Sequence, residues 1–109
     1  MTAQERIGNL LGLACRACKT ICGDFAAEKH LKKHTVPMLF LAADGGADNV
    51  EKYRRLAARK GIAVVDILTK EELGRAVGKM QNVVVLLTDA GFAKAVDKVL
   101  RTTEKGVTR

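Results

Sequence analysis

The strongest constraint on the fold is a set of three short apolar runs, each separated from the next by a segment long enough to form a helix. The runs are MLFLAA (38–43), IAVVDIL (62–68) and VVVLL (83–87). Apolar runs of this length, bounded by turn residues, predict strands that are buried on both faces of a sheet. Strands that alternate with helices predict the α/β class. We therefore expect a three-layer α/β/α sandwich around a mixed, mostly parallel sheet.

The segments between these runs carry helix signals. Residues 48–60 have apolar positions at helical spacing, and Gly61 follows the last turn, where glycine often ends a helix. Thr69 with Glu72 three residues later forms a capping-box pattern, which predicts the start of another helix. Asp89 follows the third apolar run and is a predicted cap for the last helix.

The N-terminal part is also organised as helix, strand and helix. Residues 5–18 show a helical pattern that would bury Cys18 against the core as a small apolar side chain. Residues 19–22 (KTIC) predict a short first strand. A second helix is predicted over about 24–34, with Asp24 as its N-cap.

The length of the chain, 109 residues, fits one domain, 1–109, with a core over about 5–100 and a polar, frayed tail over 102–109. No apolar run approaches the roughly 18 residues that cross a bilayer, and the first residues lack a signal-peptide pattern. The three cysteines are odd in number and close together, which favours a reducing compartment over a disulfide framework. We expect a cytoplasmic monomer without membrane contact.

Charge is the feature of the composition that bears on partners. Nineteen lysines and arginines against twelve acidic residues give a net charge of +7. A small basic domain of this kind predicts a polyanionic partner, usually nucleic acid, although a basic surface can also serve solubility alone. Only four residues are aromatic, which argues against a sheet that stacks bases, as in RRM and OB-fold domains.

A Cys-Cys-His-His outline invites a zinc-finger interpretation. Cys15 and Cys18 are followed by His30 and His34. However, a zinc finger is a small unit that folds around its metal, whereas these cysteines lie on a helical pattern and most of the chain would be left unexplained. We expect no metal and no other cofactor.

Signals for catalysis are also missing. The turn DGGADN does not match the G-x-G-x-x-G pattern of dinucleotide sites, and the chain contains no serine that could act as a nucleophile. Asp44 and Asp89 are interpreted as a turn former and a helix cap. We expect no catalytic residues, and hence a protein that is not an enzyme.

Three segments could together form a binding surface. The first opens the second helix, where free backbone N–H groups attract anions, and lysines follow on its next turns. The second is the glycine-rich loop before the third apolar run, and the third is a basic pair before the first strand. Each also has a plain interpretation, as a solvated basic face or an ordinary connection. The candidate RNA-binding residues are Arg16, Lys19, Gly23, Asp24, Phe25, Lys29, Lys32, Lys33, Gly78, Lys79, Met80 and Gln81.

Four motifs, in order over about residues 5–100, carry a resemblance to a known family. They are LGLACRACK (11–19), FLAADGGADN (40–49), TKEELGRAVGK (69–79) and VVVLLTDAGFAKAV (83–96). They resemble the kink-turn RNA-binding ribosomal proteins of the L7Ae and L30e superfamily, and within it the short bacterial branch called YlxQ. The resemblance implies an α/β/α sandwich that grips a sharply bent internal loop of RNA, as a non-enzymatic protein associated with the ribosome or with transcription.

The resemblance also implies site residues. The family signature G-x-N-E-x-x-K falls on Gly23 to Lys29, and both of these end positions match. Phe25 and Ala26 stand where the family has Asn and Glu, and neither side chain can make polar contacts to guanine edges. Phe25 offers a stacking surface instead. The loop over 78–81 occupies the second contact place. The alternative is a protein–protein interaction module on the same fold that has lost specific RNA contacts.

Overall fold

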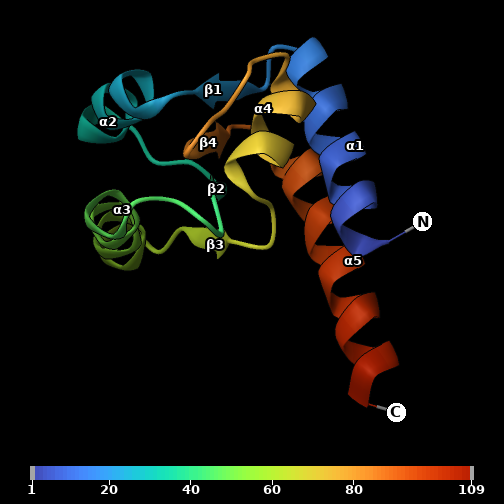
Figure 1. Ribbon diagram of the computed structural model, residues 1–109. Coiled ribbons are helices and arrows are strands. Elements are labelled where there is room, and N and C mark those ends of the chain that lie inside the picture. The colour runs from blue at the N-terminus through green and yellow to red at the C-terminus, as the bar shows by residue number, and fades with distance from the viewer. Residues whose placement is uncertain (1, 109) are drawn as a thin grey trace.

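The computed structural model describes the backbone of residues 2–108 and the side chains of residues 2–102. Its elements, in chain order, are α1 (Ala3–Arg16), β1 (Thr20–Cys22), α2 (Asp24–Lys33), β2 (Met38–Leu41), α3 (Ala47–Lys60), β3 (Ala63–Val65), α4 (Lys70–Val77), β4 (Val84–Leu87) and α5 (Ala90–Thr108). Helices α2 and α3 lie on one side of the sheet, and α1, α4 and α5 lie on the other (Figure 1). The predicted three-layer α/β/α sandwich is confirmed.

The sheet has the strand order β1-β4-β2-β3. Strand β4 runs antiparallel to both β1 and β2, whereas β2 and β3 are parallel. The sheet is therefore mixed, as predicted, but parallel pairing is not in the majority. The apolar runs indicated only burial, and burial does not depend on strand direction.

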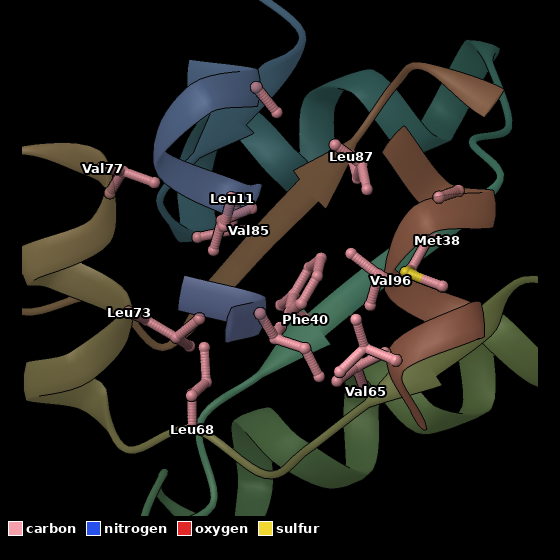
Figure 2. Close-up of a cluster of buried hydrophobic side chains, with 14 of the residues drawn as sticks. Leu11, Met38, Phe40, Val65, Leu68, Leu73, Val77, Val85, Leu87 and Val96 are labelled. Atoms are coloured by element: carbon pink, nitrogen blue, oxygen red, sulfur yellow. The ribbon is translucent and has the colours of Figure 1, made fainter. Parts of the chain in front are cut away.

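The two central strands, β2 and β4, are buried along their whole length, as predicted. Because side chains alternate along a strand, neighbouring residues supply two separate cores. Figure 2 shows Phe40 of β2 between Leu11, Leu73 and Val96, which come from the three helices on that side. On the opposite side, a second core packs beneath α2 and α3 around the buried Tyr53.

The second of the three predicted buried strands, over 62–68, is shorter and more exposed than expected. Only Ala63–Val65 forms a strand, and Ala63 is exposed while Val65 is buried. The physical reason is position, because β3 is an edge strand that pairs with β2 alone. The remaining apolar residues of the run pack from the flanking turns, as Leu68 does in Figure 2.

Four predicted helix ends are confirmed, namely both ends of α4, the end of α3 and the start of α5. The Glu72 N–H donates to Thr69 Oγ1 at 3.1 Å, and the Thr69 N–H donates to Glu72 Oε1 at 2.9 Å. Gly61 and Gly78 follow their helices in the left-handed conformation. At α5, the Phe92 N–H donates to Asp89 Oδ2 at 2.9 Å.

Two predictions near the N-terminus are wrong. Helix α1 ends at Arg16, so Cys18 lies in the following turn with φ +61° and is exposed. Cys15 is the thiol that packs against the core. Asp24 is not an N-cap, because Gly23 holds that position and Asp24 is the first residue of α2. Helix α1 thus ends two residues earlier than predicted, and the N-cap of α2 lies one residue earlier than predicted.

The C-terminal segment also differs from the expectation of a frayed tail over 102–109. Helix α5 continues to Thr108 and runs past the sheet (Figure 1). No proline or glycine directly follows Leu100 to stop the helix, and the Thr102 hydroxyl donates to the Lys98 carbonyl oxygen at 2.8 Å. Residue 109 lies outside the described residues. Within residues 2–108, no helix is long and apolar enough to cross a membrane.

Candidate nucleic-acid interface

The start of α2 is an open helix end. Gly23 adopts φ +93°, a conformation that favours glycine, and its N–H donates to the Val84 carbonyl oxygen at 3.1 Å. No side chain within the described residues caps this helix. The first N–H groups of α2 are therefore available to an external acceptor, and the helix dipole favours a negatively charged one.

Asp24, a predicted site residue, is turned toward α3. The buried Tyr53 hydroxyl donates to the Asp24 carbonyl oxygen at 2.9 Å and also contacts the Asp24 carboxylate. Lys52 Nζ lies 3.2 Å from Asp24 Oδ1. The Tyr53 hydroxyl, and then Lys52, hold the pKa of Asp24 below its usual value. Asp24 thus ties the start of α2 to α3.

Tyr53 and Lys52 support the site, although no sequence pattern indicated them. Tyr53 is the only tyrosine of the chain and lies on the inward face of α3, where a buried hydroxyl needs a partner. Burial, and then the Asp24 carboxylate, raise the pKa of Tyr53, so its hydroxyl stays protonated and acts as a donor. The sequence places the Tyr53 hydroxyl on an apolar helix face, which indicates that it needs an acceptor, but no local pattern identifies Asp24 as that acceptor.

The outward face of α2 carries one exposed aromatic ring and three exposed lysines. Phe25 is 80% exposed, which is unusual for a phenylalanine. Lys29, Lys32 and Lys33 are exposed on the following turns. None of the three takes part in an ion pair with the described residues, whereas Lys52 on α3 pairs with acidic groups of α2.

The loop between α4 and β4 is fixed by its own backbone. The Lys79 N–H donates to the Gly74 carbonyl oxygen at 2.8 Å, and the Asn82 N–H donates to the Lys70 carbonyl oxygen at 3.1 Å. A Cβ on Gly74 would lie 2.6 Å from the Met80 carbonyl oxygen, so the loop rests directly on the backbone of α4. From this base, the Met80 side chain projects into solvent and is 91% exposed.

These two regions are neighbours. The buried Asn82 places its Oδ1 atom 4.0 Å from where a Cβ on Gly23 would stand. In addition, Gly23 is hydrogen-bonded to Val84, the first residue of β4. We call the combined area, residues 23–29 and 78–81, the α2–loop surface.

The structure separates Arg16 and Lys19 from this surface. They precede β1, whereas Gly23 follows it, so they lie beyond the opposite end of that strand. The carbonyl oxygen of Lys19 accepts from the Thr88 N–H at 2.8 Å, after the last residue of β4. Arg16 lines a groove between α1 and α4.

The thiols and imidazoles do not form a metal site. The described residues contain no group of three or more His, Cys, Asp and Glu side chains that could hold a metal ion. The Cys15 thiol donates to the Val77 carbonyl oxygen at 3.7 Å, and burial raises the pKa of Cys22. The ring centroids of His30, on α2, and His34, which directly follows this helix, lie 4.9 Å apart.

Comparison with known proteins places the chain among related sequences. A profile of the "Ribosomal protein L7Ae/L30e/S12e/Gadd45 family" matches residues 5–97. A protein named "RNA-binding protein YlxQ" from Bacillus subtilis (strain 168) is 30% identical over 91 residues, which cover 84% of this chain and 91% of that protein. A protein of the same name from Enterococcus faecium is 24% identical over 97 residues, covering 89% and 93%.

Solved structures agree with this fold. A protein with unknown function from Bacillus halodurans C superposes with a TM-score of 0.80 and 29% identity, covering 87% of this chain and 96% of that one. A Giardia lamblia 15.5kD RNA binding protein superposes with a TM-score of 0.74 over 94% of this chain and 88% of its own. At 21% identity, the second likeness establishes the fold alone.

Proposed function

Because the chain belongs to the ribosomal protein L7Ae/L30e/S12e/Gadd45 family, we propose that it is an RNA-binding protein without catalytic activity of its own. Its relatives named RNA-binding protein YlxQ extend over most of its length. The observation that carries the proposal is the α2–loop surface, where an uncapped helix start, unpaired lysines and a fixed loop adjoin.

Each part of the surface has a chemical role in this proposal. The N–H groups at the start of α2 bind a phosphate or the acceptor edge of a base. Lys29 and Lys79 neutralise phosphates, with Lys32 and Lys33 further along α2. Met80 covers an unstacked base, since its flexible apolar side chain stands clear of the fold. Gly23 and Gly78 set the backbone conformations that the two segments need.

We further propose that the preferred partner is structured RNA with a kink-turn-like internal loop. The side chains of Phe25 and Ala26 cannot hydrogen-bond to guanine edges, so this chain recognises the shape of the bent backbone and its unstacked bases more than base edges. We expect a cytoplasmic monomer that works with the ribosome or the transcription machinery.

A direct test compares a labelled kink-turn RNA with a straight duplex of equal length, each titrated at two salt concentrations. Tighter binding of the kinked RNA at both concentrations is the expected result. Equal binding of the two RNAs, with the same steep salt dependence, would mean that only general phosphate attraction is present. No binding of either RNA would refute the proposed function.

The contribution of the surface is tested with paired lysine variants. Replacing Lys29 and Lys79 together with alanine should weaken kink-turn RNA binding about tenfold and reduce the slope of log affinity against log salt by about 2, since two phosphate contacts are lost. The matched control replaces Lys94 and Lys98, which lie on α5 in the opposite helical layer, and should leave affinity nearly unchanged. Similar losses in both variants would contradict the assignment of the surface.

A second candidate function, docking of a protein partner, is favoured by one observation. Phe25 and Met80 are both highly exposed apolar side chains. If they dock a protein, a partner should stay bound after nuclease treatment and should be lost when both residues are replaced with alanine. Loss of all partners on nuclease treatment would rule this candidate out.

A further inference from the structure

We propose that a groove along α2, beside β1, binds a single unpaired nucleotide of the RNA. The groove has a volume of about 500 Å³, which falls within the ~300–1,000 Å³ typical of small-ligand sites. It is lined by residues of β1 and α2 and by His34, which follows α2, and by none from the α4–β4 loop. The inference rests on the proposed function, because its ligand is RNA. The site that it assigns is a different one, which does not include the loop over 78–81.

One wall of the groove is suited to a base ring. The Phe25 side chain lines it and is 80% exposed, so a flat aromatic face is open to solvent. Ile21 from β1 and Ala26 from α2 add apolar surface next to this ring. Stacking on an aromatic side chain is the common way in which proteins hold an unpaired base, because every base has a π-face.

Two imidazoles supply polar groups to the same groove. His30 and His34 line it, with ring centroids 4.9 Å apart and ring planes inclined by 34°. Burial, and then the neighbouring His34, lower the pKa of His30, which favours its neutral form. A neutral imidazole offers one donor and one acceptor, and the edges of the nucleobases carry groups of both kinds.

The rim of the groove is positively charged. Lys29, Lys32 and Lys33 line it and have no ion-pair partner among the described residues. Their ammonium groups can therefore neutralise the phosphate attached to the bound base. An acidic peptide would use the same lysines, but it has no flat ring to match the open face of Phe25. Charge and shape together favour a nucleotide.

The groove is also continuous with the α2–loop surface. Phe25, Ala26 and Lys29 belong to both, so an RNA strand that leaves this surface along α2 passes directly into the groove. The groove still has its own residues, since Ile21, His30 and His34 lie outside residues 23–29 and 78–81. The two sites can therefore be tested separately.

The experiment titrates isotope-labelled protein with the unstructured tetranucleotide UUUU and follows backbone amides by NMR. Wild type should show saturable shifts at Ile21, Ala26 and His30. Phe25→Ala should weaken the affinity at least fivefold, because the stacking surface is lost. Leu13→Ala is the matched control, since it removes an exposed apolar side chain on α1, outside the groove and the α2–loop surface, and should leave the affinity unchanged.

Three results would overturn the groove assignment. They are equal affinity in Phe25→Ala, shifts confined to residues 78–81, or the same shifts at equal affinity with a hexaglutamate peptide, which would mean that the groove recognises charge alone. Kink-turn RNA titrated into the same sample separates the two proposals. If the kink-turn RNA binds and UUUU does not reach the groove, the groove fails and the proposed function stands. If UUUU fills the groove and the kink-turn RNA does not bind, the structured-RNA function fails and the groove stands.

Discussion

Apart from the backbone hydrogen bond from Gly23 to Val84, the two regions of the α2–loop surface are held in place by different means. The start of α2 is tied to α3 through side chains, with Asp24 bound by Tyr53 and Lys52. The loop over 78–81 is held through backbone, because it rests on α4 at Gly74 and is hydrogen-bonded there. Both regions nevertheless present an exposed apolar side chain at the outside, Phe25 in one and Met80 in the other.

This difference shows where each region is sensitive to substitution. The loop over 78–81 should tolerate substitution of its exposed side chains. It should not tolerate a side chain at Gly74, because the loop backbone fills the space where a Cβ would stand. The contacts of Asp24 with Tyr53 and Lys52 can be removed without a steric clash. Their loss should therefore lower the stability of the fold less, and the effect should depend on pH because a carboxylate takes part. The following predictions test this contrast, beginning with the largest expected effect.

Gly74→Ala should have the largest effect. The added Cβ would lie 2.6 Å from the Met80 carbonyl oxygen and 2.7 Å from the Gln81 backbone nitrogen, so the loop must move. We expect a loss of about 1–3 kcal/mol in the free energy of unfolding, measured by urea denaturation. Affinity for kink-turn RNA should fall about tenfold or more, since a displacement of the loop by 1 Å misplaces Lys79 and Met80.

Gly8→Ala is the control for this variant. Gly8 also lies inside a helix, α1, but apart from its chain neighbours and the backbone of this helix no atom stands within 4 Å of its added Cβ. Alanine is the better helix former, so the variant should gain about 0.5–1 kcal/mol of stability and bind RNA as wild type does. If Gly74→Ala behaved like Gly8→Ala, the loop would not depend on its contact with α4.

Tyr53→Phe cuts the tie at the start of α2 and should have the smaller effect. It removes the hydroxyl that donates to the Asp24 carbonyl oxygen and contacts the carboxylate, while the ring still fills the core. We expect a loss of about 1–2 kcal/mol at pH 7, measured by urea denaturation. RNA binding should weaken only slightly, because the change adds no atom that would displace α2 and this helix keeps its packing against the sheet.

The same pair of proteins gives a pH test. The pKa of Asp24 is lowered in the folded state, so the tie contributes stability that is fully present above the unfolded pKa of about 3.9 and is lost as pH falls through the folded value. The difference in unfolding free energy between wild type and Tyr53→Phe should therefore be constant from about pH 7 to pH 5 and narrow below about pH 4. A difference that stayed constant down to pH 2 would mean that the Asp24 carboxylate takes no part.

Much of the fold could be predicted from the sequence because its signals are local. The buried strands β2 and β4 follow from continuous apolar runs, and the ends of α3 and α4 follow from Gly61, Gly78 and the Thr69 capping box. Strand direction was missed, since the pairing of β4 between β1 and β2 joins segments that lie far apart in the chain.

The candidate site was predictable only in part, for the same reason. The resemblance indicated the two segments, but their adjacency depends on Gly23 meeting Val84 and Asn82. The orientation of Asp24 depends on Tyr53, 29 residues later in the chain. No local pattern encodes such contacts.

The central claim is that the start of α2 and the α4–β4 loop form one surface for RNA, and the most direct measurement is NMR mapping of a kink-turn RNA on isotope-labelled protein. We predict that the amides of residues 23–29 and 78–81 shift together, with a single affinity, while those of Lys94 and Lys98 on α5 stay unchanged. Shifts in only one of the two regions, or strongest shifts on α5, would contradict the account.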